Sequence, residues 1–513
     1  MARKVSKLTP LPILGIDVSA SGEFIAARAT TFSQNVRIKR SNITKRSGTS
    51  MLGASLGERV QYLTELDNGT TRHFMRIGLT KFEELNKATL AWTSKAGAVL
   101  TGTISDQISV AFPLLSGTRI LAYTNGKDAI RKYTGTGTDD NLGGTPPLAK
   151  YLIYYGGYLL LLNVTDGGNA YPWRTQWSDT GDPEQWATGN AGSNDLLEDS
   201  GEITGAGYFG QYFTVHKDNA IYVGYLSNTS AVFRFERKET GAGTIAHKTI
   251  LTLPTGEQIF LARDGFRIFN GITAPLIDSP IVDELRDTIN PANAYKSWGE
   301  VVRDLDEAWI AVPIGSDTEP STIYKFNYVT RQIHKDLRLN VTACSEYLNT
   351  DDKTWDDMTH SWDSDTTVWN SSDLLSLSPA VIFGFSTGVM TRQNSSSSDV
   401  SDSIDAQWDS KDFTALDIDT AEGTPMEWQE FQLWGKGTGT VEGFYSTDGG
   451  VTWVSFATLT LSSEYPSDFS PQVGYFHVIS SRIRIRIKNN VLAETFSIKQ
   501  FKLWAVARPE EWE

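Results

Sequence analysis

Hydrophobic and polar residues alternate with a period of two along most of the chain, in segments that flank glycine-containing turns. In SAVFRFERK, Phe233 and Phe235 share one face of an extended strand, and Arg234 and Glu236 share the other. Similar segments are RVQYLTELDNGTTRHFMRIG, RILAYTNGKDAIRKYTG, YLIYYGGYLLLL, QIFLARDGFRIFNG and AVIFGFSTGVMTRQ. The pattern predicts an all-β protein built from hairpins.

The turn dipeptides suggest how these hairpins are arranged. Asn68-Gly69, Asn125-Gly126, Asp264-Gly265 and Gly156-Gly157 accept the positive φ that two-residue hairpin turns require. Successive turns lie about 30 to 70 residues apart, which is compatible with irregular blades of roughly 40 to 50 residues. We therefore expect an irregular β-propeller and not a single barrel.

Helical patterning is sparse. The best case is SPIVDELRDTIN, where Ser279 is a candidate N-cap and Pro280 suits the first turn. Ile281, Leu285 and Ile289 fall on one stripe of this predicted helix. One short helix leaves the fold class unchanged.

The propeller pattern stops at the polar run NSSSSDVSDSID, which we interpret as a linker over residues 394 to 407. The segments MEWQEFQLWGKG, GVTWVSFATL and FSIKQFKLWAVA then predict a β-sandwich domain over residues 408 to 513. The propeller body is expected over residues 51 to 393. Residues 1 to 50 are expected to form a basic N-terminal arm.

Charge is unevenly distributed along the 513 residues. The net charge is −15, but the first 50 residues carry roughly +7, which leaves about −22 for the body. Such an acidic body argues against a protein that binds DNA tightly, because tight binding requires Lys and Arg side chains along the phosphates. In the arm, the candidates for docking on an acidic partner protein are Arg37, Lys39, Arg40, Lys45 and Arg46, with solubilising surface charge as the alternative.

A second basic stripe occurs in RIRIRIK near the C-terminus. Alternation puts its isoleucines on one face of a strand and its basic residues, Arg482, Arg484, Arg486 and Lys488, on the other. The favoured interpretation is a strand with a buried aliphatic side whose basic side pairs with acidic neighbours. The alternative is a docking face for an acidic subunit or for DNA.

Several kinds of chemistry have no support in the sequence. Cys344 is the only cysteine, so no disulfide forms, and we expect maturation in a reducing compartment. The six histidines lack ligand spacing, and we predict no metal site and no cofactor. The N-terminus lacks the pattern of a secretory signal, and the longest apolar run, residues 151 to 164, is too short to span a bilayer.

Two motifs have both a functional and an unremarkable interpretation. GAGYFG matches a dinucleotide-binding fingerprint through Gly205, Gly207 and Gly210, but a strand and not a helix is expected to follow it. In TWDDMTHSWDSDTTVW, carboxylates that calcium would accept as ligands are Asp356, Asp357, Asp363 and Asp365. A solvated loop whose tryptophans fill a neighbouring core is favoured there, because EF-loop spacing is absent.

The segment STDGGVTW fits the S-x-D-x-G-x-T-W box that sialidase-like propellers repeat. It predicts a structural hairpin in which Ser446, Asp448 and Gly450 form the turn and Trp453 packs beneath it. A sialidase would show several copies, whereas this chain has one clear copy. The box leaves only a small residual case for a glycosidase, and we expect no enzymatic activity.

Aromatic residues are concentrated in WRTQWSDTGDPEQWATG, which holds Trp173, Trp177 and Trp186. We interpret these side chains as wedges between blades or between subunits, where large rigid rings give much contact area.

This segment and the strand pair ending in HKDNAIYVG resemble the nozzle or hub proteins in the tails of short-tailed bacteriophages. The resemblance extends upstream through NVRIKRSNITKRSGT and GGTPPLAKYLIYYGGYLLLLN and covers residues 10 to 340. It implies a structural virion protein that assembles in the bacterial cytoplasm into a ring, a homohexamer, below the portal or adaptor. It also implies contacts with tail fibre, spike or needle proteins.

In such a ring, packaged double-stranded DNA would be retained and later conducted without specific binding, which an acidic surface favours because like charges repel. One alternative is a tail component that binds or depolymerises host glycans, supported by the box and by aromatic side chains that stack on sugars. A cellular propeller scaffold is a third possibility, although regular cellular blade repeats are absent.

Overall fold

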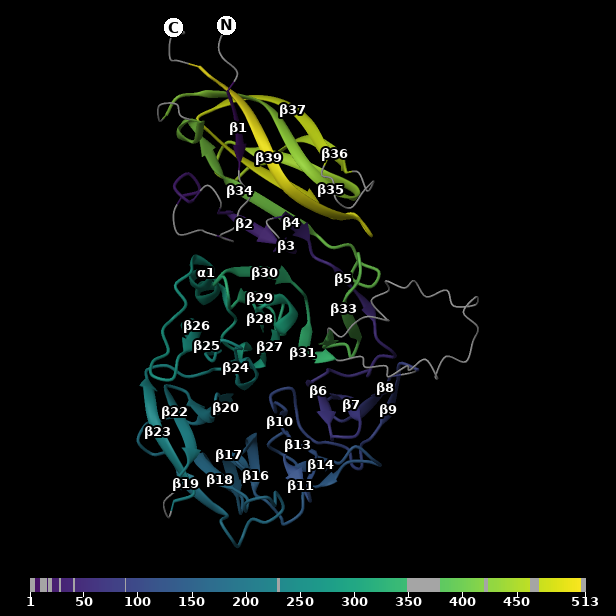
Figure 1. Ribbon diagram of the computed structural model, residues 1–513, viewed down its shortest axis with the longest axis vertical. Coiled ribbons are helices and arrows are strands. Elements are labelled where there is room, and N and C mark those ends of the chain that lie inside the picture. The colour runs from purple at the N-terminus through teal and green to yellow at the C-terminus, as the bar shows by residue number, and fades with distance from the viewer. Residues whose placement is uncertain are drawn as a thin grey trace.

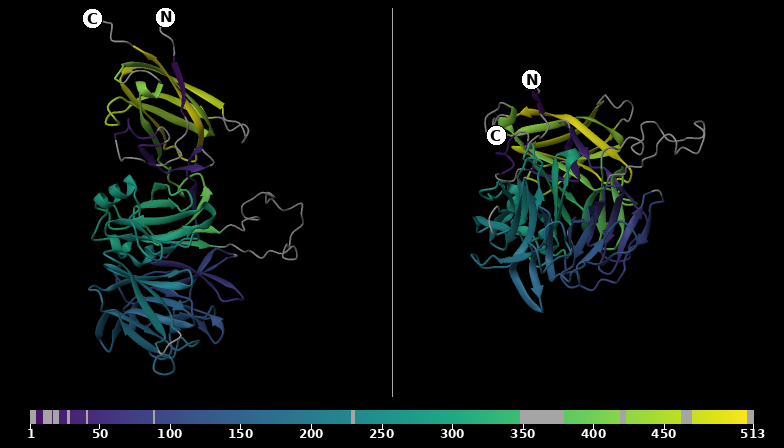
Figure 2. Two further views of the ribbon diagram at one scale, coloured as in Figure 1. Left: turned by 60° about the vertical axis from the view of Figure 1, so that its left-hand side comes forward. Right: turned by 60° about the horizontal axis from the view of Figure 1, so that its bottom comes forward.

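The computed structural model consists of a β-propeller and a β-sandwich that packs on the edge of the propeller (Figures 1 and 2). The described residues are 5–9, 16, 21–26, 29–39, 42–87, 89–227, 231–347, 379–418, 423–461 and 470–508. Strands make up 55% of the structure and helices 5%, which confirms the all-β prediction. No helix among the described residues is long and apolar enough to cross a membrane.

Within the described part of the chain, seven small antiparallel sheets form the blades of the propeller. The first blade consists of β6 (Tyr62–Asp67), β7 (Arg72–Ile77), β8 (Phe82–Asn86) and β9 (Ala91–Ser94). The second blade consists of β10 (Ser109–Ala111), β13 (Leu121–Thr124), β14 (Arg131–Tyr133) and β15 (Asp140–Asn141). A separate hairpin, β11 (Leu114–Leu115) and β12 (Thr118–Arg119), leaves the second blade. The third blade consists of β16 (Leu148–Tyr155), β17 (Tyr158–Asp166), β18 (Asn169–Trp177) and β19 (Gly192–Asp195). The fourth blade consists of β20 (Ile203–Phe209), β21 (Tyr212–Lys217), β22 (Ala220–Leu226) and β23 (Phe233–Thr240).

The last three blades complete the ring. The fifth blade has three strands, β24 (Leu251–Thr252), β25 (Gln258–Ala262) and β26 (Gly265–Phe269). The sixth blade consists of β27 (Trp298–Val302), β28 (Glu307–Val312), β29 (Thr322–Asn327) and β30 (Ile333–Leu337). The seventh joins β31 (Val341–Tyr347), β32 (Ala380–Phe385) and β33 (Met390–Ser396) to β5 (Gly48–Met51). Because β5 precedes the first blade in sequence, its pairing with β33 closes the ring with strands from both ends of the propeller.

Each pair of adjacent blades shares one hydrophobic cluster, so the core is divided into seven wedges. Between the seventh and first blades, the rings of Tyr347 and Phe74 lie with centroids 4.9 Å apart. The ring is therefore held together by side chains at every blade boundary, including the closing one.

Helical elements are short and lie in the connections between strands. Helix α1 (Pro280–Thr288) begins after Ser279 and buries Ile281 and Leu285, as predicted from the stripe, but the Ser279 side chain makes no capping hydrogen bond. The 3-10 helices are η1 (His247–Thr249), η2 (Ala294–Lys296), η3 (Arg303–Leu305) and η6 (Ala415–Ile418).

Of the predicted two-residue turns, only Gly156-Gly157 has that form. Both glycines have positive φ, and the flanking residues Tyr155 and Tyr158 pair directly. At Asn68-Gly69 the loop has four residues, because Asp67 pairs with Arg72 and the Asn68 side chain accepts hydrogen bonds from the next backbone amides. The Asn125-Gly126 loop is longer, and at Asp264-Gly265 the turn is shifted back by one residue because Gly265 already pairs within the strand.

The sandwich is a ten-stranded, nearly closed sheet that includes strands from the N-terminal end of the chain. Its strands are β1 (Val5–Thr9), β2 (Phe32–Gln34), β3 (Val36–Lys39), β4 (Asn42–Lys45), β34 (Ala406–Thr414), β35 (Met426–Ser446), β36 (Val454–Leu461), β37 (Ser470–Ser480), β38 (Arg482–Asn489) and β39 (Thr495–Ala507). The long strand β35 pairs with β37 and β39 in its first half and with β36 and β38 in its second half, so it belongs to both layers.

The N-terminal segment therefore differs from the separate arm that its charge predicted. Strand β1 pairs with β39, β2 with β34, and β4 with β39. Val36 on β3 and Ile43 on β4 bury their side chains in the sandwich core. This burial explains why the two strands join the sandwich. The chain thus enters through the sandwich, descends to close the propeller at β5, and returns from β33 to β34 (Figure 1).

Candidate functional site

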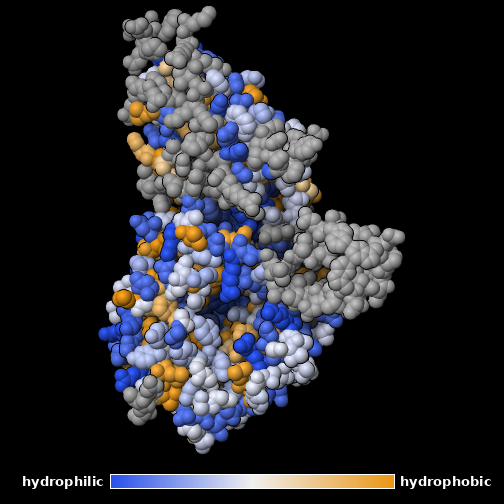
Figure 3. All heavy atoms as spheres, viewed as in Figure 1, coloured by the Kyte–Doolittle hydropathy of each residue, from blue (hydrophilic) through white to orange (hydrophobic). Residues whose placement is uncertain are grey.

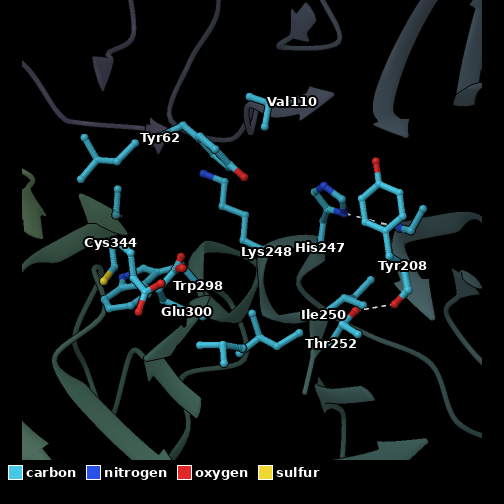
Figure 4. A pocket seen from close by; sticks show the side chains of 18 of the residues that line it. Tyr62, Val110, Tyr208, His247, Lys248, Ile250, Thr252, Trp298, Glu300 and Cys344 are labelled. Carbon is cyan, nitrogen blue, oxygen red and sulfur yellow. Dashed lines mark hydrogen bonds between the residues drawn. The ribbon is translucent and has the colours of Figure 1, made fainter. Parts of the chain in front are cut away.

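Polar side chains gather at the axis of the propeller. A cavity of about 350 Å³ lies there, lined by residues from the innermost strand of every blade (Figure 4). Its polar lining includes Gln61, Tyr62, His247, Lys248, Glu300 and Glu346. A second cavity of about 440 Å³, lined by Asp106, Lys127, Lys150 and Asn163 among others, shares His247 and Lys248 with the first. These two residues therefore line both cavities.

The residues of η1 connect four blades at this point. Lys248 Nζ donates a hydrogen bond to the carbonyl of Gln61, before the first blade, at 2.6 Å. The His247 ring lies 3.2 Å from Ser109 Oγ in the second blade and has its centroid 4.7 Å from that of Tyr151 in the third. In the fourth blade, the Ala206 amide donates to His247 Nδ1. We call this element, residues His247–Thr249, the axial plug.

Glycines make room for the plug and for Ile250, which follows it. A Cβ at Gly205 would lie 2.7 Å from Ile250 Cδ1 and 3.0 Å from His247 Nδ1, and one at Gly207 would lie 2.5 Å from Ile250 Cγ2. These two belong to the motif that resembles a dinucleotide fingerprint. Because they lie in β20 and a hairpin follows, no helix N-terminus is present to bind a phosphate.

Burial sets the protonation of the plug. It lowers the pKa of His247 to about 3, and the neighbouring Lys248 charge acts in the same direction. Burial also lowers the pKa of the Lys248 ammonium well below its ordinary value. The plug therefore contains a neutral imidazole at physiological pH.

Glu300, on β27, is the most perturbed acid of the axial cavity. Burial raises its pKa to about 8, and the negative charge of Glu346 raises it further, while Arg303 opposes the change. The thiol of Cys344 lines the same cavity, and burial raises its pKa well above the ordinary value. Glu300 therefore stays protonated near neutrality and can donate a hydrogen bond into the cavity.

The structure gives no basis for a metal centre in the part of the chain it describes. No group of three or more His, Cys, Asp or Glu side chains is placed to hold an ion there. The aspartates of the predicted calcium alternative, Asp356, Asp357, Asp363 and Asp365, lie outside the described residues.

The basic residues of the N-terminal segment face the protein itself. Lys45 and Arg46 are each only 4% exposed, which contradicts their prediction as a docking surface. Lys45 Nζ donates to Asn489 Oδ1 at 2.5 Å, and the Arg37 guanidinium lies 5.5 Å from the Trp309 ring centroid in the sixth blade. The side chain of Lys39 and all of Arg40 lie outside the described part of the structure.

Arg46 belongs to a buried ion cluster between the two domains, which we call the domain joint: Arg46, Arg338, Gln393 and Asp399. Asp399 accepts from Arg46 Nη2 at 2.5 Å and from Arg338 Nη1 at 2.8 Å, and Arg338 Nη2 donates to Gln393 Oε1 at 2.7 Å. Burial alone would raise the pKa of Asp399, but its bonds to Arg46 and the charge of Arg338 lower it overall. The joint links the β4–β5, β30–β31 and β33–β34 connections, so it holds both chain crossings between the domains.

The second basic stripe pairs with acidic neighbours, as the favoured interpretation predicted. Its isoleucines are buried and its basic side chains form ion pairs, namely Arg482 with Glu23, Arg484 with Asp412, Arg486 with Asp409, and Lys488 with Asp405. These ion pairs connect β38 to β34 and to the N-terminal segment. They leave this stripe little free charge for an acidic partner or for DNA.

The three tryptophans of the aromatic segment have different environments. Trp177 is 6% exposed, and its ring centroid lies 5.2 Å from that of Phe233 in the next blade. Trp186 packs on the cluster shared by the second and third blades, whereas Trp173 is partly exposed on β18. Contact across a blade boundary supports the wedge interpretation for Trp177 and Trp186, between blades of one chain.

The STDGGVTW box forms a hydrogen-bonded hairpin between β35 and β36. The Asp448 carboxylate accepts from the amides of Val451 and Thr452 and from the Ser446 hydroxyl, and these bonds lower its pKa. Ser446 Oγ accepts from the Gly450 amide at 2.8 Å. The Trp453 ring lies beneath the Arg486 guanidinium at 3.7 Å. These contacts agree with a structural role for the turn.

Sequence reasoning missed the axial plug, the domain joint and Glu300. His247 and Lys248 lie in an irregular segment without periodicity, and Glu300 follows the alternation of an ordinary strand. The only available signal was the pair of glycines in GAGYFG, whose spacing marks a close approach of another segment.

Comparisons with known proteins concern the fold. No protein-family model and no curated protein matches the sequence. The extracellular domain of the hybrid two-component system BT3049 from B. thetaiotaomicron aligns with 10% identity and a TM-score of 0.38, over 67% of this chain and 41% of that one. PorZ, a surface component of the type-IX secretion system of Porphyromonas gingivalis, aligns with 12% identity and a TM-score of 0.34, over 68% and 38%. BamB from Moraxella catarrhalis aligns with 12% identity and a TM-score of 0.31, over 64% and 95%.

The chain thus spans about two-fifths of the length of the first two proteins. In architecture, it is an irregular seven-bladed β-propeller with a β-sandwich formed by the C-terminal strands and four N-terminal ones.

Proposed function

We propose that this chain is a structural subunit of a bacteriophage tail, which assembles with copies of itself into a nozzle or hub ring below the portal or adaptor. In that position it retains packaged DNA and conducts it during ejection. The proposal begins from the sequence resemblance to tail proteins of short-tailed phages. The observation that carries it further is the axial plug.

The plug crosses the axis of the propeller. Lys248 reaches from η1 to the Gln61 carbonyl before the first blade, and the His247 ring packs on Tyr151 of the third blade. DNA therefore cannot pass along the axis of one propeller. A conduit requires several copies arranged around a common hole, as in the proposed homohexamer.

Charge supports the same arrangement. The net charge of −15 gives a subunit that repels phosphates, and the basic stripe on β38 is neutralised by its own ion pairs. Figure 3 shows a largely polar surface over the propeller, with separate small hydrophobic patches. A wall of this kind leaves DNA hydrated and free to slide, because it offers few cations to the backbone.

Rigidity is the second requirement of a conduit that holds DNA under pressure. The joint around Asp399 and the pairing of β1, β2 and β4 with the C-terminal strands fasten the two domains at several points. The proposed partners are the portal or adaptor on one side and fibre, spike or needle proteins on the other. No catalytic role is proposed.

The test is the assembly state of the full-length protein. We expect size-exclusion chromatography with light scattering, followed by cryo-electron microscopy, to show a symmetric ring with an axial hole wider than duplex DNA. The same preparation should show no tight binding of duplex DNA at physiological salt. A protein that stays monomeric even with purified portal protein, or a monomer or trimer that binds host polysaccharide, would refute the ring and favour the glycan-binding alternative.

A further inference from the structure

Two polar side chains occupy core positions at one end of the sandwich. Lys45 follows Ile43 on the buried face of β4, and Asn489 follows Ile487 on the buried face of β38. Lys45 is 4% exposed and Asn489 is 3% exposed. A lysine is almost never buried in this way unless a specific partner receives it. Here that partner is Asn489.

The contacts bring an amine, an amide and a carboxyl group together. Lys45 Nζ lies 2.5 Å from Asn489 Oδ1. On the other side of the amide, Asn489 Nδ2 donates to the Thr440 carbonyl at 2.6 Å and to Glu494 Oε2 at 2.8 Å. Because a backbone carbonyl only accepts hydrogen bonds, the Thr440 contact fixes the orientation of the amide, with its oxygen toward Lys45.

The backbone holds the carboxyl group of Glu494 against the amide. Glu494 Oε2 also accepts from the Thr440 amide at 2.9 Å. Gly439, with a φ of +100°, leaves room for this side chain, because a Cβ there would lie 1.9 Å from Glu494 Cδ. Ala493, directly before Glu494, has a left-handed φ of +62°, which residues other than glycine seldom adopt. The chain thus fixes this carboxyl group from two sides.

Burial favours the reactive form of the lysine. It lowers the pKa of Lys45 to about 8, and the neighbouring Arg46 charge acts in the same direction. The negative charges of Glu494, Asp405 and Asp399 oppose this change of the pKa. Only the neutral amine is a nucleophile, and a larger fraction of Lys45 than of an ordinary lysine is neutral at physiological pH.

We propose that Lys45 and Asn489 join in an intramolecular isopeptide bond, and that Glu494 carries the proton that this reaction transfers. The Lys45 amine attacks Asn489 Cγ, so the Nζ–Cγ bond forms and the Cγ–Nδ2 bond breaks. One proton passes from Nζ by way of the Glu494 carboxyl group to Nδ2, which leaves as ammonia. Glu494 ends as it began, and no oxidant or other reactant is consumed. Holding the two groups in contact makes the reaction intramolecular, which accelerates it greatly.

The bond would close a covalent loop around the whole propeller. It connects β4, from which the chain leaves the sandwich, to β38 near the C-terminus, and residues 46 to 488 lie between its two ends. Such a link restricts the unfolded chain and so stabilises the folded one. The inference does not depend on the tail function proposed above, because it concerns the side chains of a single chain.

The experiment is mass spectrometry of the full-length protein. We expect an intact mass about 17 Da below that of the sequence, which is the mass of one ammonia. Trypsin does not cleave after an amide-linked lysine, so the digest should contain a branched peptide in which residues 41–46 are joined to residues 489–499. A parent protein of full mass, or a mass loss without the branched peptide, would overturn the proposal.

Substitutions assign the three roles. Lys45→Arg and Asn489→Ala should each have their full sequence mass and give no branched peptide. Glu494→Gln should leave most molecules unjoined, because a positioned acid–base group contributes about 100-fold or more to the rate. Asn490→Ala, at the neighbouring exposed asparagine, is the matched control and should be joined as completely as the parent. Complete joining in Glu494→Gln would contradict the role of Glu494, and complete joining in Asn489→Ala would contradict the bond itself.

A second measurement does not depend on the folding of any variant. A protease site inserted between Gly167 and Gly168, in an exposed turn of the third blade, allows the chain to be cut once inside the loop. On denaturing electrophoresis after cleavage, the otherwise unaltered protein should remain one species of full mass, whereas the same protein with Asn489→Ala should separate into two fragments. Two fragments from the protein with intact Lys45 and Asn489 would show that no bond joins them.

Discussion

Replacing Trp177 by alanine should destabilise the propeller by about 3 to 5 kcal/mol. The side chain is 6% exposed and forms part of the cluster between the third and fourth blades. Truncation leaves a cavity at the boundary between these two blades. The substitution therefore tests whether aromatic wedges between blades stabilise this fold.

The magnitude follows from three losses. Burial of so large a ring accounts for most of it. The edge-to-face contact with Phe233, at a centroid distance of 5.2 Å, adds about 0.5 to 1.5 kcal/mol. The hydrogen bond from Trp177 Nε1 to the Asn190 carbonyl, 2.9 Å long, contributes about 1 kcal/mol. Partial collapse of the cavity offsets part of the sum.

Urea unfolding followed by far-ultraviolet circular dichroism measures the effect. Trp177→Phe should retain part of the ring contact and lose roughly half as much stability as Trp177→Ala. Trp173→Ala, on the same strand but partly exposed, is the matched control and should change the free energy of unfolding by less than about 1 kcal/mol. If Trp177→Ala and Trp173→Ala unfold at the same urea concentration, the wedge interpretation is refuted.

Three further predictions concern charged groups. The native protein keeps the Glu300 proton up to a pH of about 8, whereas the unfolded chain releases it near pH 4.3. The free energy of unfolding should therefore decrease between pH 5 and 8. Glu300→Gln should flatten this slope in urea titrations at several pH values. Arg46→Ala should cost about 2 kcal/mol, since it breaks a buried pair with Asp399, whereas Arg72→Ala, in a largely exposed pair, should cost under about 1 kcal/mol by the same assay. Asp448→Ala should speed hydrogen exchange at the amides of Val451 and Thr452 without changing exchange in the propeller, and unchanged exchange at these two amides would refute the role of the turn.

The local part of the fold was predictable because its causes are local. Period-two alternation marks strands such as β23, and Gly156-Gly157 supplies the positive φ of a two-residue turn. Turn lengths were predicted less well, because a side chain such as Asn68 competes for the backbone amides and lengthens the loop.

The long-range part was not predictable from pattern. Strand β5 pairs with β33 although about 340 residues separate them, and nothing in GTSM distinguishes this partner from others. The basic N-terminal segment shows the same limitation. Its charges suggested an exposed arm, whereas Lys45 and Arg46 are buried by partners that lie hundreds of residues away.

Buried charge is placed where distant segments of this chain must meet. Lys248 bonds the Gln61 carbonyl across the axis, and Asp399 bonds Arg46 and Arg338 where the chain crosses between the domains. Desolvation makes such contacts poor sources of net stability. Hydrophobic wedges tolerate small shifts of one blade against the next, whereas a bidentate ion pair is satisfied in one register only. We therefore infer that these polar contacts select the correct closure of the ring and the correct seating of the sandwich, while the aromatic wedges supply most of the free energy.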